Sequence, residues 1–168
     1  MFFRHNLVAV SGVFAAAICG PFGASAQPST ADWVIVASNS EAAMSIDRAG
    51  LKREGNKATA MVLAGLFEAD TLRGGTLVRY HLSHETFDCA MKTRTEHQVR
   101  LHESAGELVG LSEPLETDAA VRPGSIYDDV RIAACTGEVG LGGAGSPSPL
   151  AAIESEREKR AREGLSVD

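Results

Sequence analysis

The sequence predicts an α+β fold, in which a single antiparallel β-sheet of about six strands precedes a C-terminal helix tethered by a disulfide. Three observations support this prediction. Apolar and polar residues alternate in short runs, most clearly in residues 91–102, as expected for strands with one covered face. Apolar residues then take helical spacing in residues 126–135. One cysteine, Cys89, lies in the strand-rich part, and another, Cys135, lies at the end of the helical segment.

Residues 1–26 have the features of a secretory signal peptide. A positive charge precedes an apolar, alanine-rich run, and small residues allow cleavage after Ala26. The run, residues 7–18, is shorter than the about 20 residues that a membrane-spanning helix needs. Cys19 could carry a lipid, but the bulky Ile18 stands where a lipidation signal needs a small residue. We expect an exported protein, in the periplasm or at the cell surface, with no lipid anchor at Cys19 and no stable membrane span.

The chain is acidic overall. Its formal net charge is −6, and removal of the signal peptide takes away one further positive charge. This balance argues against nucleic acid and anionic membrane surfaces as partners. The remaining length fits one globular domain with a modest core, which we place at residues 31–136.

The first half of this domain predicts strands separated by turns. Residues 32–38 are rich in β-branched and aromatic side chains, and a shorter strand follows at residues 43–47. Residues 54–56 contain the Gly-Asn pair of a turn. Residues 58–67 are apolar at both parities, as expected for a strand covered on both faces, and residues 68–75 are expected to form a loop.

The second half predicts an antiparallel pair of strands. In residues 76–87 the apolar positions change parity, and a bulge near residues 83–85 would restore the register. Residues 91–102 alternate throughout, so we expect their odd-numbered side chains on a buried or half-buried face and the others in solvent. Ala90 and its neighbours form the tight connection between the two strands. Residues 106–111 are expected to add another strand.

A helix should begin after Ser125, which can cap it, while Asp128 stands in the capping-box position and suits the positive end of the helix dipole. The apolar stripe of this helix is formed by Ile126, Val130, Ala133 and Ala134. Cys135 lies close to the stripe at the helix end, so a bridge to Cys89 would fasten the helix to the sheet.

The composition changes after this helix. Residues 137–149 are rich in Gly, Ser and Pro and are expected to form a flexible linker. Residues 150–168 carry charges of both signs at helical spacing, with a small apolar face. We expect a charged tail that is partly helical or disordered and mainly in solvent.

Cys89 and Cys135 are the two cysteines that remain after the signal peptide, in a protein sent to an oxidising compartment, so a disulfide is expected. A catalytic cysteine needs an oriented base, and strand geometry directs the nearby His81 and His84 to opposite faces. A zinc site needs four ligands with paired spacings, which the sequence lacks. The catalytic cysteine and the zinc site remain alternatives, and the sequence supports each of them less than it supports the disulfide.

Other polar residues are candidates for a metal site or a catalytic site. The histidines considered for a metal are His81, His84, His97 and His102, with Glu85 nearby. The carboxylates considered for hydrolysis are Glu113, Glu116, Asp118, Asp128 and Asp129. The histidines fall on different parities, and helix capping already explains the adjacent aspartates. Trp33 and Tyr80 are expected in the core. We therefore expect no catalytic residue, no metal and no cofactor.

Several short features occur in one order along the chain. They are Trp33 in the first strand, Ile46-Asp47, Leu51-Lys52-Arg53, Phe87-Asp88-Cys89, Lys92, Arg94, Pro123-Gly124-Ser125 and Ala134-Cys135. Over about residues 32–136, this order resembles the surface-adhesin protein E family of exported bacterial proteins. The resemblance implies an antiparallel sheet with a disulfide-tethered helix. It also implies adhesion, because the family's namesake is displayed on the bacterial surface and binds extracellular-matrix proteins and plasminogen of the host.

The function expected from the sequence is a non-enzymatic, surface-adhesin-like binding module, whose exposed sheet face or edge meets a protein partner. The exposed sheet edges would also allow two copies of the chain to pair as a homodimer. The alternative is a soluble periplasmic structural domain that maintains the envelope and has no host ligand. No binding residue is transferred from the family.

Overall fold

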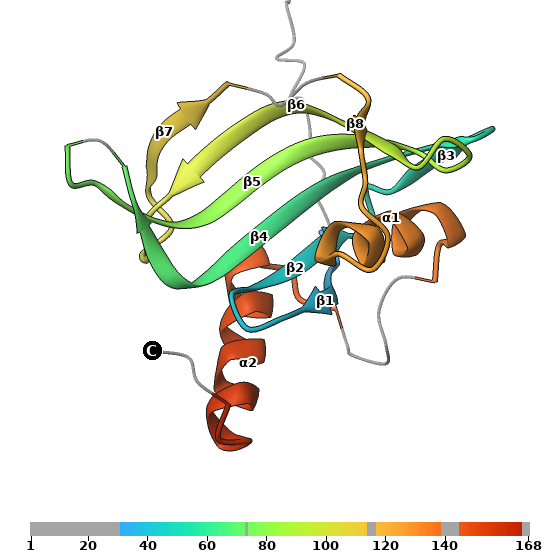
Figure 1. Cartoon of the computed structure of the whole chain (residues 1–168). Helices are drawn as coiled ribbons and strands as arrows, with labels where there is room; N and C mark the ends of the chain where they lie inside the picture. The colour runs from blue at the N-terminus through green and yellow to red at the C-terminus, as the bar shows by residue number, and fades with distance from the viewer. Residues whose placement is uncertain (1–30, 73, 114–116, 139–144, 166–168) are drawn as a thin grey trace, which may run out of the picture.

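The computed structural model describes residues 31–72, 74–113, 117–138 and 145–165. Within these residues the chain forms one eight-stranded antiparallel sheet and two α-helices (Figure 1). The strands are β1 (Trp33–Ser38), β2 (Ala42–Asp47), β3 (Lys52–Glu54), β4 (Lys57–Thr71), β5 (Leu77–Asp88), β6 (Thr93–His102), β7 (Leu108–Ser112) and β8 (Ala119–Ala120). The helices are α1 (Ile126–Thr136) and α2 (Pro149–Arg162). The predicted fold class is confirmed.

The strands follow the order β1-β2-β4-β5-β6-β7, while β3 pairs with β4 and β8 pairs with β6. The long strands β4, β5 and β6 form an arc with β7, and both helices lie at the end of the sheet made by β1 and β2 (Figure 1). The short strands β3 and β8 are additional to the predicted ones, and β4 continues to Thr71, where the sequence predicts a loop.

The two helices cover opposite faces of the sheet. Along β4, Ala58 and Val62 belong to the core cluster that includes residues of α1, whereas Leu63 belongs to the cluster that includes Ile153 of α2. Successive residues of a strand point to opposite faces. We call these the α1 face and the α2 face. The double coverage explains why residues 58–67 are apolar at both parities.

The same arrangement corrects the expected bulge in β5. This strand keeps one register with β4 from Tyr80 to Asp88. Tyr80 packs into the cluster on the α2 face, and Phe87 packs into the cluster on the α1 face. The apolar parity of β5 therefore changes because a different face is covered at each end of the strand.

A bulge does occur at this level, in the neighbouring strand. His84 pairs with Gln98 and Glu85 pairs with Glu96, so β6 contains one extra residue, His97. A bulge shifts the side chains on one side of it to the other face of the sheet.

The predicted alternation of residues 91–102 is consequently wrong in its first half. Val99 and Leu101 are buried as expected. On the other side of the bulge, Arg94 and Glu96 turn to the α1 face beneath α1, although the sequence predicts them in solvent.

Helix α1 forms where the sequence predicts it. The backbone N–H of Asp128 donates to Oγ of Ser125, the N-cap, at 3.3 Å. Val130, Ala133 and Ala134 are buried against the sheet. The disulfide between Cys89 and Cys135 joins the segment after β5 to the last turn of α1, and the predicted bridge is confirmed.

Helix α2 differs from the expected solvated tail, because it docks on the sheet. Its Ile153 is fully buried. The hydroxyl of Tyr80 donates to Glu154, and Arg157 donates to the carbonyl oxygen of Phe67 at 3.2 Å. Ser146, just before the helix, exchanges two backbone hydrogen bonds with Trp33. Residues 139–144 of the predicted linker lie outside the described residues, as do residues 166–168 of the tail.

Candidate functional site

A large part of the α2 face is not covered by α2, and we call it the open face. Cross-strand partners share a face of the sheet. The open face can therefore be followed across the strands through three pairs, which are Lys52 with Thr59, Thr59 with Thr86, and Arg100 with Leu111. The open face comprises Lys52, Glu54, Lys57, Thr59, Met61, Leu82, His84, Thr86, Thr95, His97, Gln98, Arg100, Leu108 and Leu111. Most of these side chains are charged or polar, and many are exposed.

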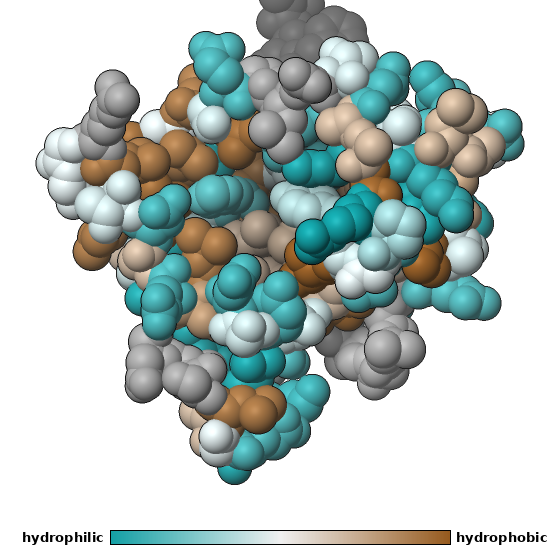
Figure 2. Space-filling view, viewed as in Figure 1, coloured by the Kyte–Doolittle hydropathy of each residue, from teal (hydrophilic) through white to brown (hydrophobic). Residues whose placement is uncertain are grey.

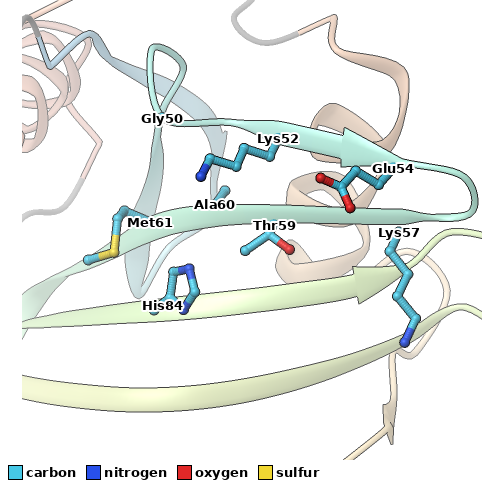
Figure 3. Close-up of a pocket in the computed structure, with 8 residues that line it drawn as sticks. All are labelled: Gly50, Lys52, Glu54, Lys57, Thr59, Ala60, Met61 and His84. Atoms are coloured by element: carbon cyan, nitrogen blue, oxygen red, sulfur yellow. The ribbon is translucent and has the colours of Figure 1, made fainter.

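A groove of about 550 Å³ lies at the β3 end of the open face. It is lined by Gly50, Lys52, Glu54, Lys57, Thr59, Ala60, Met61 and His84 (Figure 3). Figure 3 shows Lys52 extending along β3 toward the end where Met61 and His84 lie, whereas Lys57 points away from that end. Neither lysine forms an ion pair within the described part of the chain.

Two histidines meet beside the groove. The ring centroids of His84 and His97 are 5.4 Å apart. Nε2 of His97 lies 2.9 Å from Oγ1 of Thr86, which in turn lies 3.2 Å from Oγ1 of Thr59. Partial burial lowers the pKa of His84 below its ordinary value, and the positive charges of His97 and Lys52 lower it further. Lys52 and His97 therefore lie close enough to His84 to act on it electrostatically.

A second polar cluster lies on the opposite face, beneath α1. Glu85 is fully buried and accepts hydrogen bonds from Ser83 at 2.7 Å and from Arg94 at 3.2 Å. The guanidinium of Arg94 also lies 3.7 Å from the ring centre of Tyr127 on α1. Burial raises the pKa of Glu85, although Arg94 and Ser83 oppose the shift. The sheet and α1 enclose this cluster, so we assign it to the docking of α1.

The comparison with known families shows which family the chain belongs to. A family model described as surface-adhesin protein E matches residues 33–136. The chain belongs to the surface-adhesin protein E family. Its match ends at the last residue of α1, so α2 lies outside the part that this family's model covers. The resemblance predicted from the sequence is confirmed.

A comparison with solved structures finds the crystal structure of protein E from non-typeable Haemophilus influenzae, with a TM-score of 0.38 and 14% sequence identity. The match covers 74% of this chain and 89% of that chain. No curated protein matches the chain. Among the described residues of this surface-adhesin protein E family member, neither helix is long and apolar enough to cross a membrane.

In this surface-adhesin protein E family member, the candidate metal ligands and aromatic residues from the sequence do not gather at one place. His84 and His97 come together on the open face, whereas Nδ1 of His102 lies 2.9 Å from the carbonyl oxygen of Gly106. Trp33 and Tyr80 are buried, as expected. Across the parts of the chain with described positions, no group of three or more His, Cys, Asp or Glu residues could hold a metal ion.

The carboxylates that were weighed for hydrolysis are used elsewhere or lie apart. Asp128 accepts the backbone N–H of Gly124 at 3.0 Å and pairs with Arg131 at 2.6 Å, which together lower its pKa. Asp118 accepts a hydrogen bond from Thr95 at 3.3 Å. Ala26, Cys19 and Glu116 lie outside the described residues.

The sequence did not reveal the pairing of His84 with His97. The two residues are 13 positions apart, and the alternation of residues 91–102 predicts His97 on the same face as Val99 and Leu101. The bulge in β6 separates them, because His97 and Gln98 both lie on the open face while Val99 and Leu101 turn to the other face. A break in the pairing of two strands depends on both strands, so no local pattern in residues 91–102 reports it.

Proposed function

We propose that this protein is an exported, non-enzymatic binding module of the surface-adhesin type, and that its open face contacts an extracellular protein ligand. Membership of the surface-adhesin protein E family supports the adhesin role. The single observation that supports the contact surface is the uncovered half of the α2 face. It exposes side chains of β3, β5, β6 and β7, and only its Met61 and Leu82 pack against the core cluster that includes Ile153 of α2.

The β7 side of the open face supports a protein ligand rather than a small molecule. Leu108 is 56% exposed and Leu111 is 66% exposed. Figure 2 views the molecule from the side of α1, opposite the open face, and there too hydrophobic residues gather where β7 lies in Figure 1. Exposed apolar side chains beside polar ones are typical of protein interfaces. Within the described residues, β7 pairs only with β6, which leaves one backbone edge for a partner strand.

The proposed location is tested first on intact bacterial cells that produce the full chain with a C-terminal tag. We expect an added protease to remove the tag from intact cells, because an adhesin has to be reachable from outside. The control is a periplasmic marker protein, which should stay intact until the outer membrane is opened. Complete protection of the tagged chain until that point would contradict the adhesin function and favour the envelope-maintenance alternative.

The open face is tested with purified mature protein on immobilised plasminogen and on a basement-membrane extract. We expect Arg100→Glu combined with Leu111→Asp to weaken binding by about tenfold or more, because these changes place negative charge in the middle of the proposed interface. Arg122→Glu is the matched control, since Arg122 is exposed in the segment that leads into α1. Equal loss in both variants, or no loss in the first, would contradict the open face as the contact surface.

A further inference from the structure

We propose that the groove beside His84 binds a carboxylate group from an acidic side chain of the protein ligand. This inference rests on the proposed function, because it names the chemistry that one part of the open face recognises. The carboxylate would lie between the ammonium of Lys52 and the imidazole of His84, above Thr59 and Met61.

The charges around this position favour an anion. Lys52 extends toward His84 and has no ion-pair partner in the described residues (Figure 3). His97 lies against His84, with 5.4 Å between ring centres, and neither ring has a carboxylate hydrogen-bonded to it within that part. A negative group placed here gains attraction from each of these cationic or ionisable groups.

The uncharged lining suits the rest of an acidic side chain. Oγ1 of Thr59 can donate a hydrogen bond, and it sits beside Oγ1 of Thr86 at 3.2 Å. Met61 is the cross-strand neighbour of His84 and is half-buried, so its thioether offers an apolar contact for methylene groups. The groove therefore combines donors for a carboxylate with a surface for an aliphatic stem.

Negative residues limit how many anionic groups can bind. Glu54 lines the same groove, Asp88 ends β5, and Asp118 approaches the open face at Thr95. The whole chain also carries a net charge of −6. A sulfated polysaccharide needs a continuous basic surface, whereas one carboxylate needs only the pair of Lys52 and His84. We therefore assign the groove to a peptide rather than to a polyanionic glycan.

The neighbouring strand edge also favours a peptide. β3 is three residues long and, in the described part of the chain, pairs with β4 alone. Its other backbone edge can accept an extended segment. Such a segment would run beside Lys52, with its acidic side chain directed into the groove.

Proton uptake should accompany binding. The charged or ionisable groups on the same face of the sheet as His84 are Lys52 and Glu54 on β3, Lys57 on β4, Asp88 on β5, and His97 and Arg100 on β6. Of these, His97 and Lys52 act on the pKa of His84. In the free protein His84 has a lowered pKa and is neutral near pH 7. A bound carboxylate favours the charged imidazole and raises this pKa, so affinity should increase as pH falls through the titration of His84.

The test is an NMR titration of the full mature chain with two short blocked peptides, acetyl-Leu-Glu-Leu-amide and acetyl-Leu-Gln-Leu-amide. We expect the glutamate peptide to shift the ring signals of His84 and the methyl signal of Met61, and to raise the pKa of His84. Its affinity should be several-fold higher at about pH 5.5 than at about pH 7.5, where His84 is neutral. Lys52→Ala should weaken binding about fivefold.

Lys159→Ala is the matched control and should leave the titration unchanged, because Lys159 lies on α2 and its side chain is 56% exposed. Equal binding of the two peptides, or an affinity that does not increase at lower pH, would overturn the proposal. Shifts caused only by a heparin tetrasaccharide would replace the peptide with a sulfated glycan and would also overturn it. Protease protection on cells would instead overturn the surface function and leave this titration unaffected.

Discussion

Replacement of Cys89 and Cys135 together by alanine is expected to lower the free energy of unfolding by about 4 kcal/mol. The bridge closes a loop with a sequence separation of 46 residues, and its removal returns that conformational freedom to the unfolded chain. The loss is large for a small domain, whose net stability is about 5–15 kcal/mol. Urea denaturation of the mature protein, followed by circular dichroism, measures the change.

The last turn of α1 should be the first region to loosen when the bridge is removed. Arg53 also reaches this turn, because its guanidinium donates to the carbonyl oxygen of Thr136 at 2.7 Å. That exposed contact is worth much less than the disulfide. Hydrogen exchange should therefore accelerate in α1, while the centre of β4 and β5 stays protected.

Reduced wild-type protein is the control for this experiment, and it should unfold at the same urea concentration as the Cys89→Ala, Cys135→Ala variant. If the double variant loses less than about 1 kcal/mol, the bridge adds little to the packing of α1, and the entropic argument fails for this chain.

Local signals explain which parts of the fold could be predicted. Ser125 and Asp128 mark the start of α1 within four residues of sequence, and Cys135 marks its end. The predicted removal of the signal peptide leaves an even pair of cysteines, so the bridge could be predicted from composition. The position of β6 was also predicted from its alternation, although the face assigned to its first half was wrong.

Relations between distant segments explain what could not be predicted. The bulge at His97 is a property of two paired strands, and it decides that Arg94, beneath α1, shares a face with Val99 although their positions differ in parity. The docking of α2 is similar. Its apolar contact is small, and its polar anchors include carbonyl oxygens of β4 where the pairing with β5 is interrupted.

Those carbonyl oxygens form a site that only the folded sheet creates. The register of β4 and β5 shifts between Gly65 and Asp70, which leaves the carbonyl groups of Leu66 and Phe67 free to accept from side chains. Arg79 from β5 and Arg157 from α2 both donate to Phe67. A helix with few apolar residues can therefore dock firmly, and a count of apolar positions underestimates its stability.

Gly65→Ala is expected to weaken the docking of α2 and to lower the free energy of unfolding by about 1–3 kcal/mol. A Cβ atom at this position would overlap Cγ2 of Ile153 and lie 2.9 Å from its Cγ1. Ile153→Ala is expected to cost about 2–5 kcal/mol by itself, because the isoleucine is fully buried. Both values come from urea denaturation of the mature protein.

The double variant decides whether these two residues act through one contact. Ile153→Ala removes the atoms that the new methyl group of Gly65→Ala would strike, so the double variant should lose at least about 1 kcal/mol less than the sum of the single variants. Gly110→Ala is the matched control in β7, because a Cβ there would lie 3.8 Å from Cδ1 of Leu101, an ordinary contact. It should leave stability nearly unchanged and combine additively with Ile153→Ala. Additive losses for Gly65→Ala as well would mean that α2 is not held against β4 by this contact, and that its other contacts, among them the hydrogen bonds to Phe67 and Tyr80, carry its docking.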